Sequence, residues 1–465
     1  MLAHGSGSSA PCVLNGCGSA SDYAEQLLIS LGASVRRTFQ YPDRTPDLAW
    51  AQSGAMALTG RHDGAPQRCP APLASCVDGV RATLLSLTGK DIDLPDARTL
   101  GERAAFSGLT RNGAISPGGA CYLLRAADGW LAVNLPRLDD WRLTEAWLEI
   151  EGKPLLPEQW HELAQLLAVQ PLARLIERGA LLGLAIAPLQ QDDQSVSPWF
   201  RIMAQGMRQP EYLKAHRHTP PLVIDLSALW AGPLCTHLLQ QLGMRVIKVE
   251  SLQRPDGARH GSQDFYDLMN QGKASVALDF SDRRDIERLR SLLCCADIVI
   301  ESSRPRGLRQ LGIDAEECVN TTPGLSWLSI TGYGRDAEHE NRIAYGDDAG
   351  VAGSLSALLL AQTGEALFCG DAIADPLTGW HTALAALASY QSGGGRLISL
   401  ALRDVVAHCA AQPMPTTNEP IPPEQIAPPQ ARKASTPARP LGADTARILR
   451  EFDGFDGFGK FDIPC

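Results

Sequence analysis

Residues 221–251 read PLVIDLSALWAGPLCTHLLQQLGMRVIKVES, and this stretch decides the fold class of the chain. The pattern predicts a buried strand, a loop, a helix opened at Pro233 and a second strand. A strand, a helix and a strand in this order form a βαβ unit with parallel strands. Two more apolar runs, ADIVIES (296–302) and LSWLSITGYG (325–334), alternate with helical patterns. We therefore expect an α/β protein whose large domain is a doubly wound, Rossmann-like parallel sheet.

The hydrophobic and turn patterns on either side of this stretch divide the chain into five parts. The segment ACYLLRAADGWLAVNL (120–135) predicts a hairpin that turns at Asp128-Gly129. Helical patterns follow it, so a small α/β domain is expected over 101–205. The large domain is expected over 215–411, followed by a Pro-rich, semi-rigid linker over 412–438. A C-terminal return segment is expected over 439–465, and a partial, degenerate copy of the large domain over 1–100.

That first copy is inferred from an internal repeat of two segments in the same order. AEQLLISLGASVRR (24–37) aligns with THLLQQLGMRVIKV (236–249) and places Gly32 opposite Gly243. LASCVDGVRATLLSLTG (73–89) aligns with IADPLTGWHTALAALAS (373–389) and places Ser75 opposite Asp375. Chance similarity of short apolar helices is the alternative, and the shared order argues against it. We expect the two copies to pack together.

Composition and charge exclude several classes of function. The chain has 465 residues, of which 44% are hydrophobic and 20% charged, as expected for a folded protein of two or three domains. Its net charge of −10 and the absence of a long basic run argue against nucleic-acid binding. No signal-peptide pattern and no apolar run of about 20 residues is evident, so a cytoplasmic location without a membrane partner is expected. The 12 cysteines form no CxxC pair, so reduced thiols without a metal site or disulfide framework are expected.

The stretch FCGDAIADPLTGWHTALAALASY (368–390) contains the strongest catalytic candidate. Asp375 directly precedes Pro376, and Asp at an N-cap followed by Pro predicts that a helix begins there. The positive end of the helix would favour the ionised carboxylate. Asp375 is therefore either a cap alone or an available anion at the helix end.

Six segments resemble, in family order, the class III CoA-transferases, the family of formyl-CoA and carnitine CoA-transferases and α-methylacyl-CoA racemases. They are DLSALWAGP, LGMRVIKVES, NQGKASVALDF, ADIVIESSRPRGLRQLGI, PGLSWLSITGYG and IADPLTGWHTALAAL. The resemblance is dense over 220–411, and the expected small domain and C-terminal return also look like family segments. In the family the small domain is inserted after the first half of the large domain, whereas here it precedes the good copy. The chain therefore resembles a fused, rearranged, double-length member.

The resemblance implies that Asp375 is the nucleophile, forming an aspartyl anhydride and then an aspartyl-CoA thioester. Asp371 is the competing candidate. A glycine-rich loop of the family matches Gly118 and Gly119, whose backbone could stabilise the thioester oxyanion; a simple turn is the alternative.

By matching position, the family's CoA contacts fall on several loops of the large domain. These are Trp230, Ala231, Arg254, Leu278, Ser302, Arg304, Leu311 and Tyr345. Trp230 and Ser302 depart from the usual side chains, and Arg335-Asp336 replaces a common Gly-Pro. For Arg254 and Arg304 a solvated surface charge is the alternative.

Three functions remain open at this point. CoA transfer between an acyl-CoA and a free carboxylic acid is favoured. Racemisation at the α-carbon needs a proton donor and acceptor, but Tyr345 stands where the racemases have a histidine, and His339 lies elsewhere. The third is a non-catalytic acyl-CoA-binding homologue. CoA enters as a substrate, no permanently bound cofactor is expected, and a homodimer and an internal pseudo-dimer both stay open.

Overall fold

The computed structural model describes residues 11–150, 154–190, 197–209, 220–415 and 421–452. The chain divides into two compact units, the first formed by residues 1–201, 330–384 and 399–432, the second by residues 202–329, 385–398 and 433–465. This division differs from the predicted domains, because residues 330–384 and 399–411 of the expected large domain join residues 1–100 in the first unit.

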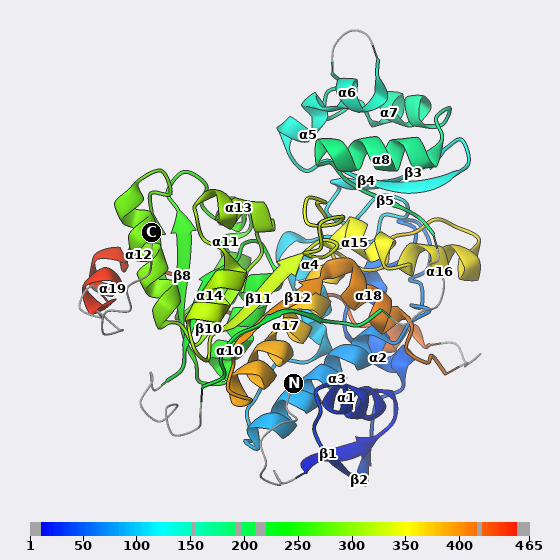
Figure 1. The fold of residues 1–465 in the computed structure, drawn as a ribbon. Coiled ribbons are helices and arrows are strands. Elements are labelled where there is room, and N and C mark those ends of the chain that lie inside the picture. The colour runs from blue at the N-terminus through cyan, green and yellow to red at the C-terminus, as the bar shows by residue number, and fades with distance from the viewer. Residues whose placement is uncertain (1–10, 151–153, 191–196, 210–219, 416–420, 453–465) are drawn as a thin grey trace. The chain divides into compact units, whose positions relative to one another are not determined.

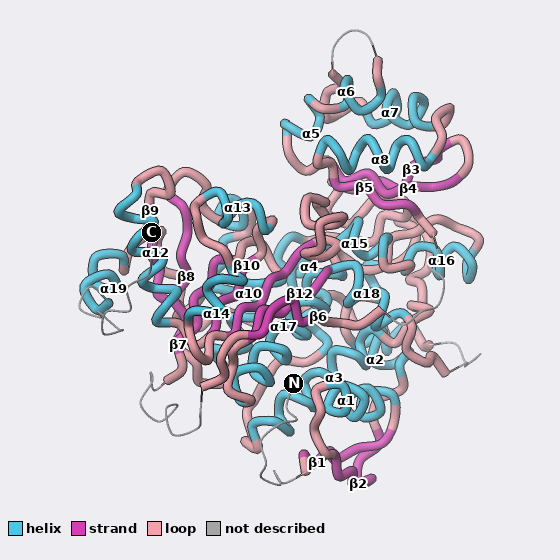
Figure 2. The backbone as a smooth tube through the Cα atoms, viewed as in Figure 1, coloured by secondary structure: helices cyan, strands magenta, loops and turns pink. Residues whose placement is uncertain are grey.

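A seven-stranded sheet dominates the second unit (Figure 2), with strand order β6-β12-β11-β10-β7-β8-β9. Its strands are β6 (Arg201–Gln205), β7 (Leu222–Leu226), β8 (Arg245–Ser251), β9 (Ala274–Leu278), β10 (Ile298–Glu301), β11 (Ser326–Thr331) and β12 (Arg396–Ala401). The pairs β8–β9, β7–β8, β7–β10 and β10–β11 are parallel. Counted from β7, the order from β9 to β12 is the 3-2-1-4-5-6 order of a Rossmann fold, with its switch point between β7 and β10. The predicted doubly wound sheet is confirmed.

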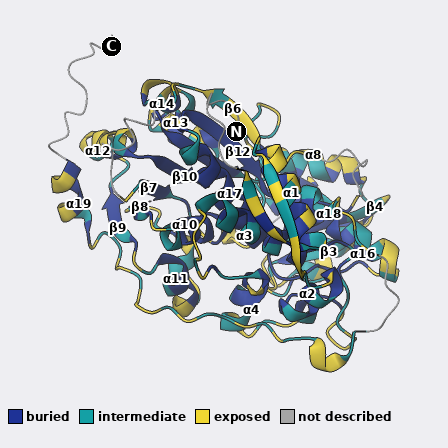
Figure 3. Cartoon of the chain, turned by 90° about the horizontal axis from the view of Figure 1, so that it is seen from below, coloured by how far each residue is buried: buried dark blue, intermediate teal, exposed yellow. Residues whose placement is uncertain are grey.

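Short polar residues cap three of the helices around this sheet. The helices are α10 (Ala231–Gln241), α11 (Gln263–Asn270), α12 (Arg283–Cys295), α13 (Pro305–Gln310), α14 (Ala315–Thr321) and α19 (Thr445–Phe452). Ser262, Asp282 and Asp314 cap α11, α12 and α14 through their side-chain oxygens. Figure 3 shows exposed residues on α12 and buried strands β7 and β10. Helix α19 packs beside β9, where Asp444 Oδ2 accepts a hydrogen bond from Ser275 N at 3.0 Å.

A small antiparallel sheet belongs to the first unit (Figure 1). Its strands are β3 (Cys121–Ala126), β4 (Gly129–Asn134) and β5 (Ala185–Pro188). Ala126 pairs with Gly129, so the hairpin turns at Ala127-Asp128, one residue earlier than the predicted Asp128-Gly129, and Gly129 is the first residue of β4. One face is covered by α5 (Leu138–Arg142), α6 (Thr144–Leu148), α7 (Trp160–Leu167) and α8 (Leu172–Leu182). The other face packs against Val351 and Phe368.

The N-terminal part of the first unit begins with a second βαβ unit. Strands β1 (Cys12–Cys17) and β2 (Val35–Pro42) are parallel and are joined by α1 (Ser19–Ser30). The aligned segment β7–α10–β8 has the same order, although the repeat itself stays a prediction. The remaining helices are α2 (Pro46–Gln52), α3 (Leu73–Thr88), α4 (Glu102–Ser107), α15 (Gly346–Ala352), α16 (Leu355–Thr363) and α18 (Leu402–Ala410), with α17 (Ala374–Gln391) continuing into the second unit.

The Pro-rich segment is docked where the structure describes it. In the first unit, Ala427 N donates to Ala51 O at 3.0 Å, and Arg432 forms an ion pair with Glu102. In the second unit, Ala438 N donates to Asp267 Oδ1 at 3.0 Å. Proline has a fixed φ and no N–H, so ordering such a segment costs little conformational entropy.

The described residues bear on a membrane span and on the state of the cysteines. No helix among them has the length and apolar character needed to cross a membrane. The 11 cysteines in this part of the chain are free thiols.

Candidate active site

Asp375 lies in the first turn of α17 rather than at its cap. The helix begins at Ala374, one residue before Asp375, so the predicted start at Pro376 is wrong. The reason is a turn at Ala372, which has φ +43° and whose carbonyl accepts a hydrogen bond from Asp375 N at 3.0 Å. A carboxylate in the first turn still interacts favourably with the positive end of the helix dipole. The Asp375 side chain is half-buried.

The loop before α17 lies against the start of α15. The Asp375 carboxylate contacts Gly346, where a Cβ would overlap Asp375 Oδ2 and the carbonyl of Ala372. Ala372 N donates to Asp347 Oδ1 at 2.8 Å and so ties the two segments together. Tyr345, a predicted CoA contact, directly precedes Gly346, and the structure therefore places it in the same site as Asp375.

Arg103 on α4 is a member of this site that sequence reasoning missed. Its Nε donates to Asp371 Oδ2 at 2.9 Å, and its Nη2 contacts Asp371 Oδ1. The Asp371 side chain is 0% exposed, whereas that of Arg103 is 30% exposed. The Arg103 charge also acts on Asp347 and Asp375. Asp371, the competing nucleophile, is therefore buried in an ion pair.

Burial raises the pKa of three carboxyl groups around the site. Burial raises the pKa of Asp347 to about 6, the charge of Asp371 raises it too, and Arg103 opposes both. Burial also raises the pKa of Asp371, again opposed by Arg103. For Asp348 burial raises the pKa to about 7 against a hydrogen bond from Asn134. Asp348 Oδ2 has no hydrogen-bond partner among the described residues, as suits a carboxyl group that keeps its proton near neutral pH.

The predicted glycine loop lies beside Arg103. Gly119 has φ +78° and donates from its N–H to Ser116 O at 2.8 Å, which closes a tight turn. A Cβ on Gly118 would stand 3.2 Å from Arg103 Nη2. Both glycines are exposed. Within the first unit, the structure thus connects Gly118 to Asp371 and Asp375 through Arg103.

The other predicted CoA contacts belong to the second unit, at the carboxyl ends of its strands. Ser302 Oγ accepts a hydrogen bond from Ala228 N at 3.0 Å, which joins the loops after β10 and β7 at the switch point. Trp230 and Ala231 begin α10, and the buried Trp230 ring packs edge-on against Phe265, with centroids 5.5 Å apart.

The remaining candidates lie farther along the same edge. Leu278 is buried at the end of β9, and its carbonyl accepts a hydrogen bond from Leu252 N at 2.9 Å. Arg254 follows in an exposed loop. Arg304 is the half-buried residue before α13, and Leu311 directly follows that helix.

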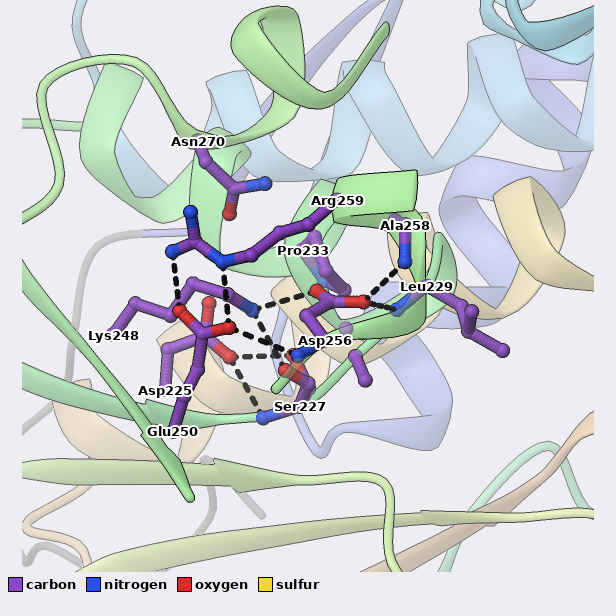
Figure 4. A network of polar contacts seen from close by, with 12 residues as sticks. Asp225, Ser227, Leu229, Pro233, Lys248, Glu250, Asp256, Ala258, Arg259 and Asn270 are labelled. Atoms are coloured by element: carbon purple, nitrogen blue, oxygen red, sulfur yellow. Dashed lines mark hydrogen bonds and ion pairs between the residues drawn. The ribbon is translucent and has the colours of Figure 1, made fainter. Parts of the chain in front are cut away.

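A buried ionic network supports the loop between β7 and α10 (Figure 4). Lys248 Nζ lies 2.9 Å from Asp256 Oδ2 and donates to Ser227 O at 2.8 Å. Asp256 Oδ1 accepts a hydrogen bond from Leu229 N at 2.9 Å and so holds Leu229 at φ +67°. Burial would raise the pKa of Asp225, but Lys273 and Lys248 lower it to about 2.

The sequence feature that indicates this network is the presence of charged residues inside the apolar runs VIDL and VIKVES. An ionisable side chain in a buried strand must be paired, so Asp225 and Lys248 could have been expected to lie in such a cluster.

The chain is an α/β protein with a doubly wound sheet, and several loops converge at the switch point of this sheet. In proteins of this architecture, ligands bind at the carboxyl ends of the strands. Residues 222–441 match the model of CoA-transferase family III. The match leaves the predicted fusion and repeat untested.

The relatives carry related names. A succinate–glutarate CoA-transferase from Agrobacterium fabrum is 31% identical over 208 residues, which are 40% of this chain and 52% of the relative. A succinyl-CoA:glutarate CoA-transferase from Mus musculus is 28% identical over 201 residues, or 41% and 46% of the two chains. A solved CaiB/BaiF family protein from Brucella suis is 27% identical with a TM-score of 0.34, covering 40% of this chain and 53% of its own. The chain thus spans about half the length of the curated relatives it matches.

Proposed function

We propose that the protein transfers CoA from an acyl-CoA thioester to a free carboxylic acid, with Asp375 as the nucleophile. The Asp375 carboxylate attacks the thioester carbonyl, forms a mixed anhydride and releases CoA thiolate. The thiolate then attacks the Asp375 carbonyl, gives an aspartyl-CoA thioester and releases the first acid. The acceptor carboxylate repeats the two steps in reverse, so that acceptor-CoA leaves and Asp375 returns to its ionised form.

The observation that carries this proposal is the position of the Asp375 carboxylate. It is half-buried in the first turn of α17 and packed against the Cα of Gly346. The helix end and Arg103 both favour its ionised form. Asp371 has the same functional group, but it is completely buried and held by Arg103. Of the two candidates, Asp375 is therefore the better nucleophile.

The substrate class follows from the family match and from the relatives' names. We infer an acyl-CoA donor and a carboxylate acceptor, with CoA as a substrate and no permanently bound cofactor. The proposed CoA site is formed by the loops that contain Trp230, Ala231 and Ser302 at the switch point. We further propose a cytoplasmic location. A mass measurement in solution distinguishes a homodimer from an internal pseudo-dimer.

The test is CoA exchange measured by mass spectrometry. Purified protein is incubated with a panel of acyl-CoAs and isotopically labelled carboxylates, in water and in deuterium oxide. The proposal predicts that the labelled acid appears as its CoA thioester, without deuterium at the α-carbon. Deuterium uptake without exchange would instead indicate a racemase, and binding of acyl-CoA without either reaction would indicate a non-catalytic homologue.

A further inference from the structure

We propose that Arg103 is the positioning residue of the Asp375 site: it fixes the loop before α17 through Asp371 and places a positive charge near Asp375. This inference rests on the proposed function. Arg103 lies outside residues 222–441, so the family match assigns it no role.

The first observation is the two-point contact between Arg103 and Asp371. A guanidinium that binds both oxygens of a carboxylate fixes its direction as well as its distance. Asp371 belongs to the four-residue loop from Gly370 to Ile373 that leads into α17, where Gly370 has φ +67° and Ala372 φ +43°. Gly370 adopts positive φ at little cost, but Ala372 is strained there, so an external contact helps to hold the shape of the loop. Arg103 provides that contact from α4.

The second observation is the excess of acidic groups near Asp375. Asp371 lies in the same loop, and Asp347 and Asp348 lie on α15. Tyr345 also precedes α15, and Cys121 on β3 interacts with Asp347 and Asp348. Arg103 is the basic group that lowers the pKa of both Asp347 and Asp371. Without its charge, these carboxyl groups would disfavour ionisation of Asp375.

The third observation links Arg103 to the glycine loop. The Arg103 guanidinium occupies the space beside the Gly118 Cα, where a Cβ would stand 3.2 Å from Nη2. A side chain at residue 118 would therefore press on the same guanidinium that holds Asp371. Arg103 thus connects the glycine loop at Gly118 with the loop that leads into α17 and Asp375.

A matched ion pair on the same helix separates positioning from simple stabilisation. Glu102, the neighbour of Arg103 on α4, pairs with Arg432. The exposed fractions of the two pairs are nearly equal, 30% and 0% for Arg103 and Asp371 against 30% and 2% for Arg432 and Glu102. Arg432→Met should therefore destabilise the protein about as much as Arg103→Met, but it leaves the charge near Asp375 unchanged.

The test compares pH profiles of Arg103→Met, Arg103→Lys and Arg432→Met. We expect Arg103→Met to lower kcat about 100-fold, the loss typical of a misplaced reacting group, with KM for acyl-CoA changed less than about threefold. Because the lost charge favoured the ionised carboxylate, the acid limb of the kcat profile should move to higher pH. Arg103→Lys keeps the positive charge, so the acid limb of its kcat profile should lie at the wild-type pH, while kcat itself should recover only in part. Arg432→Met should match wild type both in kcat and in the pH of the acid limb.

A second readout does not require turnover. A diazo compound esterifies protonated carboxyl groups, and peptide mass spectrometry reports the pH at which Asp375 stops reacting. This pH should rise in Arg103→Met and stay at the wild-type value in Arg432→Met. If Arg103→Met and Arg432→Met have the same labelling pH for Asp375 and the same kcat, the positioning role is refuted. If wild type exchanges no CoA while the labelling pH still shifts, the proposed function fails and the role of Arg103 stands.

Discussion

The carboxylate of Asp375 lies directly against the Cα of Gly346, the first residue of α15. The contact leaves no room for a Cβ, because one would overlap both Asp375 Oδ2 and the carbonyl of Ala372. Neither partner can move easily, since Ala372 N is bound to Asp347 and Asp375 N to the Ala372 carbonyl. The start of α15 therefore determines where the Asp375 carboxylate stands.

Gly346→Ala should displace Asp375 and lower kcat about 100-fold, because reacting groups lose efficiency when shifted by about 1 Å. Gly350→Ala, one turn later on α15, is the control. There a Cβ would meet only the Ile373 and Leu355 side chains, at 3.1 and 4.0 Å. Steady-state rates that fall equally in both variants would contradict this account.

Ser75→Ala should keep full turnover. The Ser75 side chain is 2% exposed, and its Oγ has no hydrogen-bond partner among the described residues. Removing a buried, unsatisfied hydroxyl should leave stability unchanged or raise it by about 1 kcal/mol. Denaturant unfolding and CoA-exchange rates check both statements. Loss of exchange in a folded Ser75→Ala protein would mean that the first copy takes part in catalysis.

Asp348→Asn should stabilise the protein at pH 8 but not at pH 4. The folded pKa of Asp348 is raised to about 7 from 3.8, so the stability that its protonated form contributes is present at low pH and lost as pH rises toward 7. Asparagine can accept the same hydrogen bonds from Asn134 and Tyr345 without this loss. The gain at pH 8 should be roughly 4 kcal/mol by denaturant unfolding. A gain that is independent of pH would contradict the assigned cause.

Leu229→Gly should stabilise the second unit by about 1 kcal/mol, because leucine at φ +67° is strained and glycine is not. Leu229 is 44% exposed, so little apolar burial is lost. Leu252→Gly is the control, since this leucine is 53% exposed and is not among the positive-φ residues. Glycine there should destabilise by about 0.5–1 kcal/mol. Thermal unfolding should show shifts of opposite sign.

The sheet could be predicted from sequence because its signals are local. The runs VIDL and VIKVES flank one helix, and their apolar character alone places β7 and β8 side by side. The start of α17 was predicted two residues late, because the turn at Ala372 depends on its contact with Asp347. Arg103 could not be predicted, since 268 positions separate it from Asp371 and nothing in α4 marks it as functional. The docking of the Pro-rich segment likewise depends on distant partners such as Glu102.

The most direct measurement is covalent trapping of Asp375 during turnover. Hydroxylamine should convert the activated carboxyl to a hydroxamate, visible as a mass shift on the peptide that contains Asp375. Asp375→Asn should lower exchange by about 10³-fold or more, since an amide cannot form the anhydride, while stability changes by only about 1 kcal/mol. A hydroxamate on Asp375 together with this loss is the predicted result. A hydroxamate on Asp371 instead, or near-normal exchange by Asp375→Asn, would contradict the assignment of Asp375 as the nucleophile.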